Sequence, residues 1–144
     1  MHIESAQKWL KAGAAVLVGF GLLGPIGALP ATSEITRFFA DLAFFPLDGT
    51  PAQLDPAARL FWAITGGVIA GWGMMIWIVA TRLLPREPAL ARSMVLTAAV
   101  VWFVIDSLGS VFAGAPVNAI YNIGFLALFV VPLWRPIETA ARAA

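Results

Sequence analysis

Four long apolar runs, separated by short polar segments, dominate the hydrophobic pattern of this chain. We predict that they form helices over residues 9–29, 57–84, 93–112 and 116–134. A helix needs about 20 mainly apolar residues to cross the hydrocarbon core of a bilayer. Each run is close to or above this length. The pattern therefore predicts an all-α membrane protein, a four-helix transmembrane bundle that forms a single domain over residues 1–144.

The segment between the first two runs has a different pattern, which predicts a short amphipathic helix over residues 33–45. Apolar residues recur there at helical spacing, with charged residues on the other side. The apolar set is Ile35, Phe38, Phe39, Leu42 and Phe45, and the charged set is Glu34, Arg37 and Asp41. Because this helix is too short and too charged to span, we expect it to lie in the outer membrane interface. We interpret it as a connector resting on lipid; the alternative is a lid over a site or a docking surface.

The second run carries small residues at every fourth position. Ala63, Gly67 and Gly71 form one stripe, and Gly66 and Ala70 lie beside it. Such stripes let two helices approach until their backbones touch. We expect this contact to form inside the bundle, and the alternative is a seam between two copies of the chain.

The composition supports the membrane interpretation and excludes several functions. Of the 144 residues, 60% are hydrophobic and 12% are charged, whereas soluble domains carry about twice that charge. The net charge of +1 offers no basic field to nucleic acid. The chain has no cysteine and a single histidine, His2 near the start, so thiolate chemistry and a histidine site within the spans both lack their residues. We predict no catalytic residues, no metal and no cofactor.

The charges also predict an orientation. One face collects the basic residues before the first run, between the second and third, and after the fourth: Lys8, Lys11, Arg82, Arg86, Arg92, Arg135 and Arg142. On the other face two arginines are outnumbered by acids: Arg37 and Arg59 against Glu34, Asp41, Asp48 and Asp55. By the positive-inside rule, both termini are cytoplasmic.

Asp106 is the best clue to function, because it is an ionisable residue inside the third apolar run. A carboxylate in hydrocarbon costs about 3 kcal/mol or more, so it persists where it faces protein or water. At a rise of about 1.5 Å per residue, Asp106 and Asn122 both lie about 10 Å from the outer ends of their helices. Asn118 shares a face of the fourth helix with Asn122, and Tyr121 is next to them.

The sequence therefore predicts a polar cluster in the outer half of the bundle. Thr65 reaches nearly the same level, Ser107 and Ser110 flank the carboxylate, and Trp62 and Trp102 are possible walls. Arg59, at the mouth of the second helix, could extend toward Asp106 or turn outward. The candidate ligand-binding residues are Asp106, Asn118, Asn122, Tyr121, Thr65, Arg59 and Trp102.

Three interpretations of the cluster are open. The polar side chains could hold the helices together. They could instead form a pocket, open to the outside or to lipid, in which Asp106 holds a cation or a polar head group. The third interpretation is a path for protons or ions. We expect a non-enzymatic accessory protein or a protein that binds a small ligand or lipid; the alternative is a small oligomeric transporter or channel that uses Asp106.

Two short stretches give the chain a family likeness. An arginine at the mouth of the second run precedes a glycine pair (ARLFWAITGG), and a small-residue turn joins the last two runs (SLGSVFAGAPVNAIYN). In this layout the chain resembles small four-span bacterial membrane proteins that include the DoxX-like families. The resemblance implies a place in the bacterial inner membrane and an accessory role there. The partners we expect are the lipid bilayer and either a larger membrane complex or further copies of the chain. The chain departs from it in its longer Phe-rich segment and in its lack of a redox ligand.

The orientation predicts the behaviour of a reporter enzyme fused after Ala144. With four spans and cytoplasmic termini, a reporter that works only in the cytoplasm should be active, because the basic segments stay on that side. Activity of a periplasm-specific reporter at the same position would contradict the four-span topology.

Overall fold

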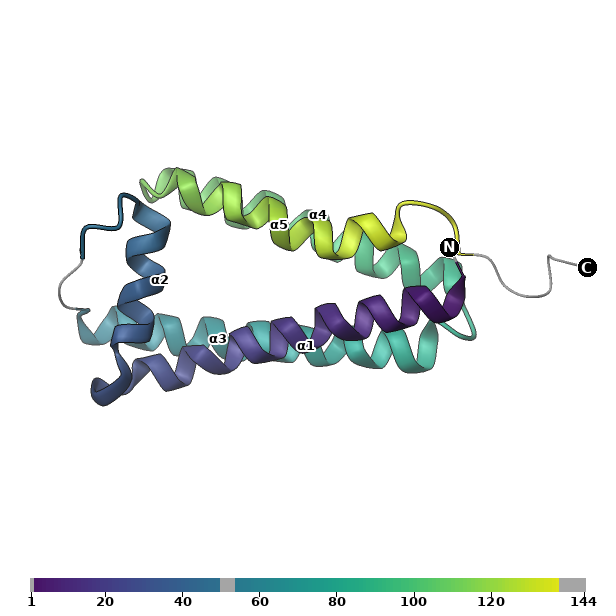
Figure 1. Cartoon of the computed structure of the whole chain (residues 1–144), viewed down its shortest axis with the longest axis horizontal. Helices are drawn as coiled ribbons and strands as arrows, with labels where there is room; N and C mark the ends of the chain where they lie inside the picture. Colours follow the sequence, from purple (N-terminus) through teal and green to yellow (C-terminus); the bar gives the residue numbers. More distant parts are fainter. Residues whose placement is uncertain (1, 50–53, 138–144) are drawn as a thin grey trace, which may run out of the picture.

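The computed structural model describes residues 2–49 and 54–137, and this part of the chain is all-helical (Figure 1). Its elements are α1 (Ile3–Ala28), the 3-10 turn η1 (Pro30–Thr32), α2 (Glu34–Phe44), α3 (Pro56–Ile78), the π-helical turn η2 (Val79–Leu83), α4 (Pro88–Phe112) and α5 (Pro116–Leu133). Within this part, four helices are long and apolar enough to cross a membrane: α1, α3 with η2, α4 and α5. The predicted all-α, four-span architecture is confirmed, and the chain is a multi-pass membrane protein.

The helices extend beyond the apolar runs at two starts. α1 begins at Ile3 and not at residue 9, and α4 begins at Pro88 and not at residue 93. Hydropathy marks the stretch that suits hydrocarbon, whereas a helix continues for as long as packing stabilises it. Ala6 and Ala91, in these added turns, are fully buried against the core. Arg142, counted above among the basic residues, lies outside the described residues.

The four long helices form two antiparallel hairpins, α1 with α3 and α4 with α5 (Figure 1). The hairpins meet at the end of the molecule where α1 begins and α5 ends, which we call the Ile3 end; the opposite end is the α2 end. The largest fully buried side chains are Leu10, Ile76, Leu84, Phe129 and Leu133. All five lie in the half toward the Ile3 end, so the core occupies one half of the bundle.

Side-chain hydrogen bonds to backbone carbonyl oxygens fix the Ile3 half. Gln7 Nε2 donates to the oxygen of Ala80, in the π-helical turn, at 3.0 Å. Trp9 Nε1 donates to that of Leu128 at 2.8 Å, and Arg92 Nε to that of Leu133 at 2.6 Å. A π turn displaces carbonyl groups from regular helical bonding, and Gln7 supplies one of them with a donor. These bonds join α1 to η2, α1 to α5, and α4 to the end of α5.

Glycines bring α1 and α3 into backbone contact toward the α2 end. A Cβ added at Gly24 would lie 2.6 Å from the Cα of Gly66, and one added at Gly21 would lie 2.5 Å from the Ala70 nitrogen. The stripe that packs is therefore the one with Gly66 and Ala70. A Cβ at Gly67 or at Gly71 would meet no atom within 4 Å, so these two glycines of the other predicted stripe face open space.

This contact predicts opposite outcomes for two neighbouring glycines. Gly66→Leu should destabilise the fold by about 1–3 kcal/mol or more, because its side chain would overlap the backbone of α1. Gly67→Leu, the matched control, should change stability by less than about 1 kcal/mol, since Leu favours a helix over Gly and has free space there. Thermal unfolding in detergent measures both. Equal melting temperatures for the two variants would contradict the α1–α3 contact.

Candidate functional site

A large cavity separates the two hairpins toward the α2 end. It has a volume of about 1200 Å³ and is lined by residues of α1, α2, α3, α4 and α5. A smaller chamber of about 210 Å³ shares Phe20, Trp62, Asp106 and Phe125 with it. Most of the lining is aliphatic or aromatic, so the cavity suits a molecule with an apolar body.

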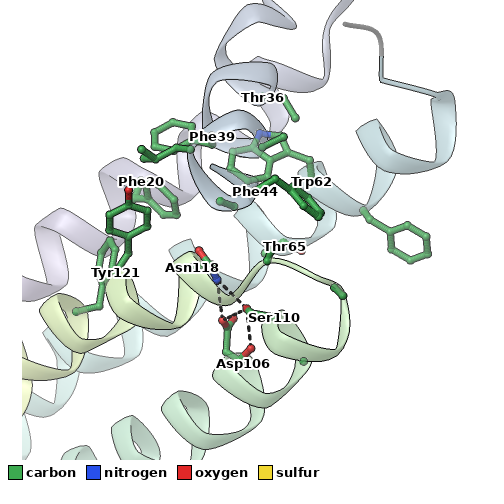
Figure 2. Close-up of a pocket in the computed structure, with 18 of the residues that line it drawn as sticks. Phe20, Thr36, Phe39, Phe44, Trp62, Thr65, Asp106, Ser110, Asn118 and Tyr121 are labelled. Atoms are coloured by element: carbon green, nitrogen blue, oxygen red, sulfur yellow. Dashed lines mark hydrogen bonds between the residues drawn. The ribbon is translucent and has the colours of Figure 1, made fainter. Parts of the chain in front are cut away.

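α2 forms the end wall of the larger chamber. It runs across the α2 end from the α1–α3 hairpin toward α5 (Figure 1), and Thr36, Phe39 and Phe44 are among its lining residues (Figure 2). Phe39 stacks on Trp62 with ring centroids 5.7 Å apart and meets Phe20 edge-on at 5.2 Å. The helix begins and ends within one residue of its predicted bounds. α2 therefore covers the cavity at this end, as the lid interpretation requires.

Contacts at the α2 end hold α2, α1 and α3 together. Thr36 is buried and packs against Gly27 of α1, where a Cβ would find no room. Trp62 Nε1 donates to the carbonyl oxygen of Leu23 at 3.3 Å, which joins α3 to α1 beside this point. The loop after α2 is tied back to that helix, because the Asp41 carboxylate accepts hydrogen bonds from the backbone N–H groups of Asp48 and Gly49 at 3.1 and 3.2 Å.

The predicted polar cluster forms one wall of the cavity, between α4 and α5. Asp106 Oδ1 accepts from Asn122 Nδ2 at 2.7 Å and from Asn118 Nδ2 at 3.3 Å. Asn118 also donates to Ser110 Oγ at 2.9 Å, and Figure 2 shows both residues turned toward the carboxyl group. Asn122 is only 5% exposed and also donates to Ser107 Oγ at 3.3 Å. Asp106 and the two asparagines are level and face each other, as predicted.

The two oxygens of Asp106 have different surroundings. Oδ1 accepts from both asparagine amides, and Ser110 Oγ lies 3.4 Å away from it. Among the described residues, none donates to Oδ2. Asp106 lines both chambers and is half-buried. One oxygen therefore joins α4 to α5, and the other accepts no hydrogen bond from the described residues.

Aromatic rings enclose the smaller chamber on the side toward the Ile3 end. Trp72 of α3 and Trp102 of α4 are 5.6 Å apart between ring centroids, and Trp102 meets Phe125 of α5 at 6.4 Å. Phe20 of α1 meets Phe125 at 5.7 Å. Trp102 was predicted as a wall, whereas no sequence pattern singled out Phe20, Trp72 or Phe125. Single aromatic residues in apolar runs look the same whether they face lipid or protein.

The other predicted site residues divide into two groups. Thr65 and Tyr121 line both chambers. Arg59 lines neither chamber, and its guanidinium makes no hydrogen bond or ion pair with any described residue. The structure thus gathers six of the seven candidate residues around the cavity and leaves Arg59 out.

The chemistry of the lining suits binding. The described residues contain no group of three or more His, Asp or Glu side chains close enough to hold a metal ion. Asp106 provides an acceptor, Thr65 and Tyr121 provide hydroxyl groups, and apolar side chains provide most of the remaining surface. No family model, curated protein or solved structure matches the chain.

The hydrogen bond between Asp106 and Asn122 predicts a measurable coupling. In a double-mutant cycle of Asp106→Ala and Asn122→Ala, we expect a coupling energy of about 1 kcal/mol, the scale of buried interhelical hydrogen bonds in membrane bundles. Unfolding in mixed micelles measures it. Asn122→Ala combined with Asp55→Ala, a distant helix cap, should be additive. Additivity in the Asp106 cycle as well would contradict the observed pairing.

Proposed function

We propose that this protein binds one apolar or amphiphilic small molecule, or a lipid, in the cavity between its hairpins, and that it does so without catalysis. The observation that carries the proposal is the cavity itself, about 1200 Å³ with a largely apolar lining and one polar cluster. Cavities of this kind bury the body of a ligand against apolar walls and orient it through a few polar groups. The two asparagines that hold Asp106 in place fit this division of roles.

A ligand of this kind reaches the cavity from the bilayer. Phe61 of α3 lines the larger chamber and is nevertheless 66% exposed, so the chamber extends to the flank of the bundle. Ile64 and Val68 of α3, and Ile105 and Leu108 of α4, are also exposed apolar side chains near this level. A flank with this composition is solvated by lipid tails, which supports lateral access for a molecule already dissolved in the membrane.

We further propose that the protein lies in the bacterial inner membrane with both termini cytoplasmic. In this orientation α2 lies in the outer interface, and its exposed Phe38 contacts the acyl boundary. The charge difference between the two ends of the spans supports this orientation. An accessory role in a larger complex, or assembly of several copies, fits the same arrangement.

The alternative, a transporter or channel that uses Asp106, has less support. The cavity lies toward the α2 end, whereas Leu10, Phe129 and Leu133 fill the half toward the Ile3 end and are fully buried. Passage through one chain would need this packed half to open. The geometry therefore favours holding a molecule over conducting one.

Filling the cavity should remove the bound molecule. Gly109 and Gly124 line the larger chamber, and a Cβ at either position meets no atom within 4 Å. The double variant Gly109→Phe/Gly124→Phe should carry about tenfold less bound small molecule or lipid than the wild type, because the added rings fill the space that the ligand would occupy. Native mass spectrometry of protein purified from membranes measures this occupancy.

The matched control is Gly67→Phe/Gly71→Phe. These glycines have equally open surroundings but line neither chamber. This variant should keep the wild-type occupancy. Equal loss in both double variants, or unchanged occupancy in the cavity-filled one, would contradict the proposed binding site.

A further inference from the structure

The smaller chamber combines aromatic rings with one acid. Its rings come from four helices: Phe20, Trp62, Trp72, Trp102, Tyr121 and Phe125. Asp106 lies on the same lining, in a volume of about 210 Å³. The faces of aromatic rings carry negative potential and attract cations, Trp most strongly. Rings and carboxylate therefore favour the same sign of charge in the bound molecule.

The charged residues of the lining also favour a positively charged ligand. Among the described residues that line either chamber there is no Lys, Arg or His, and Asp106 is the one acid. A carboxylate in a largely apolar cavity is stabilised by a cation beside it. No such cation comes from the lining, and Arg59 lies outside it. A cationic ligand would supply the missing charge.

The hydrogen bonds around Asp106 disfavour a ligand head that can only accept. The amide N–H groups of Asn118 and Asn122 already donate to Asp106 Oδ1 and to serine hydroxyl groups, whereas no described residue donates to Oδ2. A carbonyl or quinone oxygen placed there would meet another acceptor. A phosphate would meet a carboxylate without any basic side chain to balance it.

We propose, building on the proposed binding function, that the ligand is an amphiphilic organic cation. Its ammonium group lies in the smaller chamber between Asp106 and the tryptophan rings, and its apolar body extends into the larger chamber beneath α2. The ammonium group could come from a free lipophilic amine or from a choline lipid. The lack of basic side chains in the lining favours a cation that carries no phosphate.

Three probes with the same alkyl chain separate these possibilities: octyltrimethylammonium, octylphosphocholine and octanol. Affinities are measured by tryptophan fluorescence on protein purified in uncharged maltoside micelles, with protein-free micelles as the blank. We expect octyltrimethylammonium to bind at least about tenfold more tightly than octanol, through ion pairing and cation–π contact. Octylphosphocholine should bind more weakly than octyltrimethylammonium.

Two variants locate the effect at this chamber. Asp106→Asn should reduce the preference for the cation over octanol to about threefold or less, because the charge is removed and the shape is kept. Asp55→Asn makes the same change of charge outside the cavity, at a helix cap where Asn serves equally well, and should keep the preference. If Asp106→Asn does not fold, Trp102→Leu replaces it, with the 73% exposed Trp134 mutated to Leu as its control.

The outcomes distinguish this inference from the proposed function. Equal affinity of the wild type for octyltrimethylammonium and octanol would contradict the inference that the ligand is a cation, but not the proposed binding function. Tightest binding of octylphosphocholine would also contradict that inference, in favour of a choline lipid. Failure of all three probes to bind would overturn the binding function together with the cation. A cation preference that persists in both Asp106→Asn and Trp102→Leu would show that the cation does not bind in this chamber.

Discussion

The backbone contact between α1 and α3 determines the shape of the molecule toward the α2 end. Gly21 and Gly24 leave α1 no side chain at the point where Gly66 of α3 approaches. The two helices therefore act as one rigid wall, from which Phe20 and Trp62 project into the cavity. A wall held together internally does not need the second hairpin for its stability there, so a space can remain between the two.

The second hairpin is held in a different way. Toward the α2 end, α4 and α5 are joined by the polar cluster around Asp106, where Asn122 and Asn118 donate to the same carboxyl oxygen. These hydrogen bonds satisfy a buried amide and place an acid at the cavity surface at once. The hairpins meet each other in the Ile3 half, through Phe129 and the Trp72–Trp102 pair. The cavity is thus the space between two separately stabilised pairs that are joined at one end and covered by α2 at the other.

Much of this arrangement follows from sequence pattern, and the part that does not has a physical reason. Hydropathy located the four spans, and the helical rise placed Asp106 level with Asn122, because both depend on spacing along a single helix. The separation of the hairpins depends on contacts between residues far apart in the chain, which no local pattern reports. For the same reason the sequence could not distinguish the packed Gly66 from the open Gly67, or select Phe20 and Trp72 as walls. Arg59 was a candidate because its side chain is long enough to approach Asp106, but the length of a side chain does not determine its direction.

The most direct test is an experimental structure of the protein in a lipid nanodisc, determined by cryo-electron microscopy with a rigid fiducial partner. We predict two hairpins that stay apart at the α2 end, with density for a bound molecule extending from beneath α2 to the carboxyl group of Asp106. Hairpins packed together at that end, with Asp106 turned away from Asn122 and no space between Thr65 and Ser110, would contradict it.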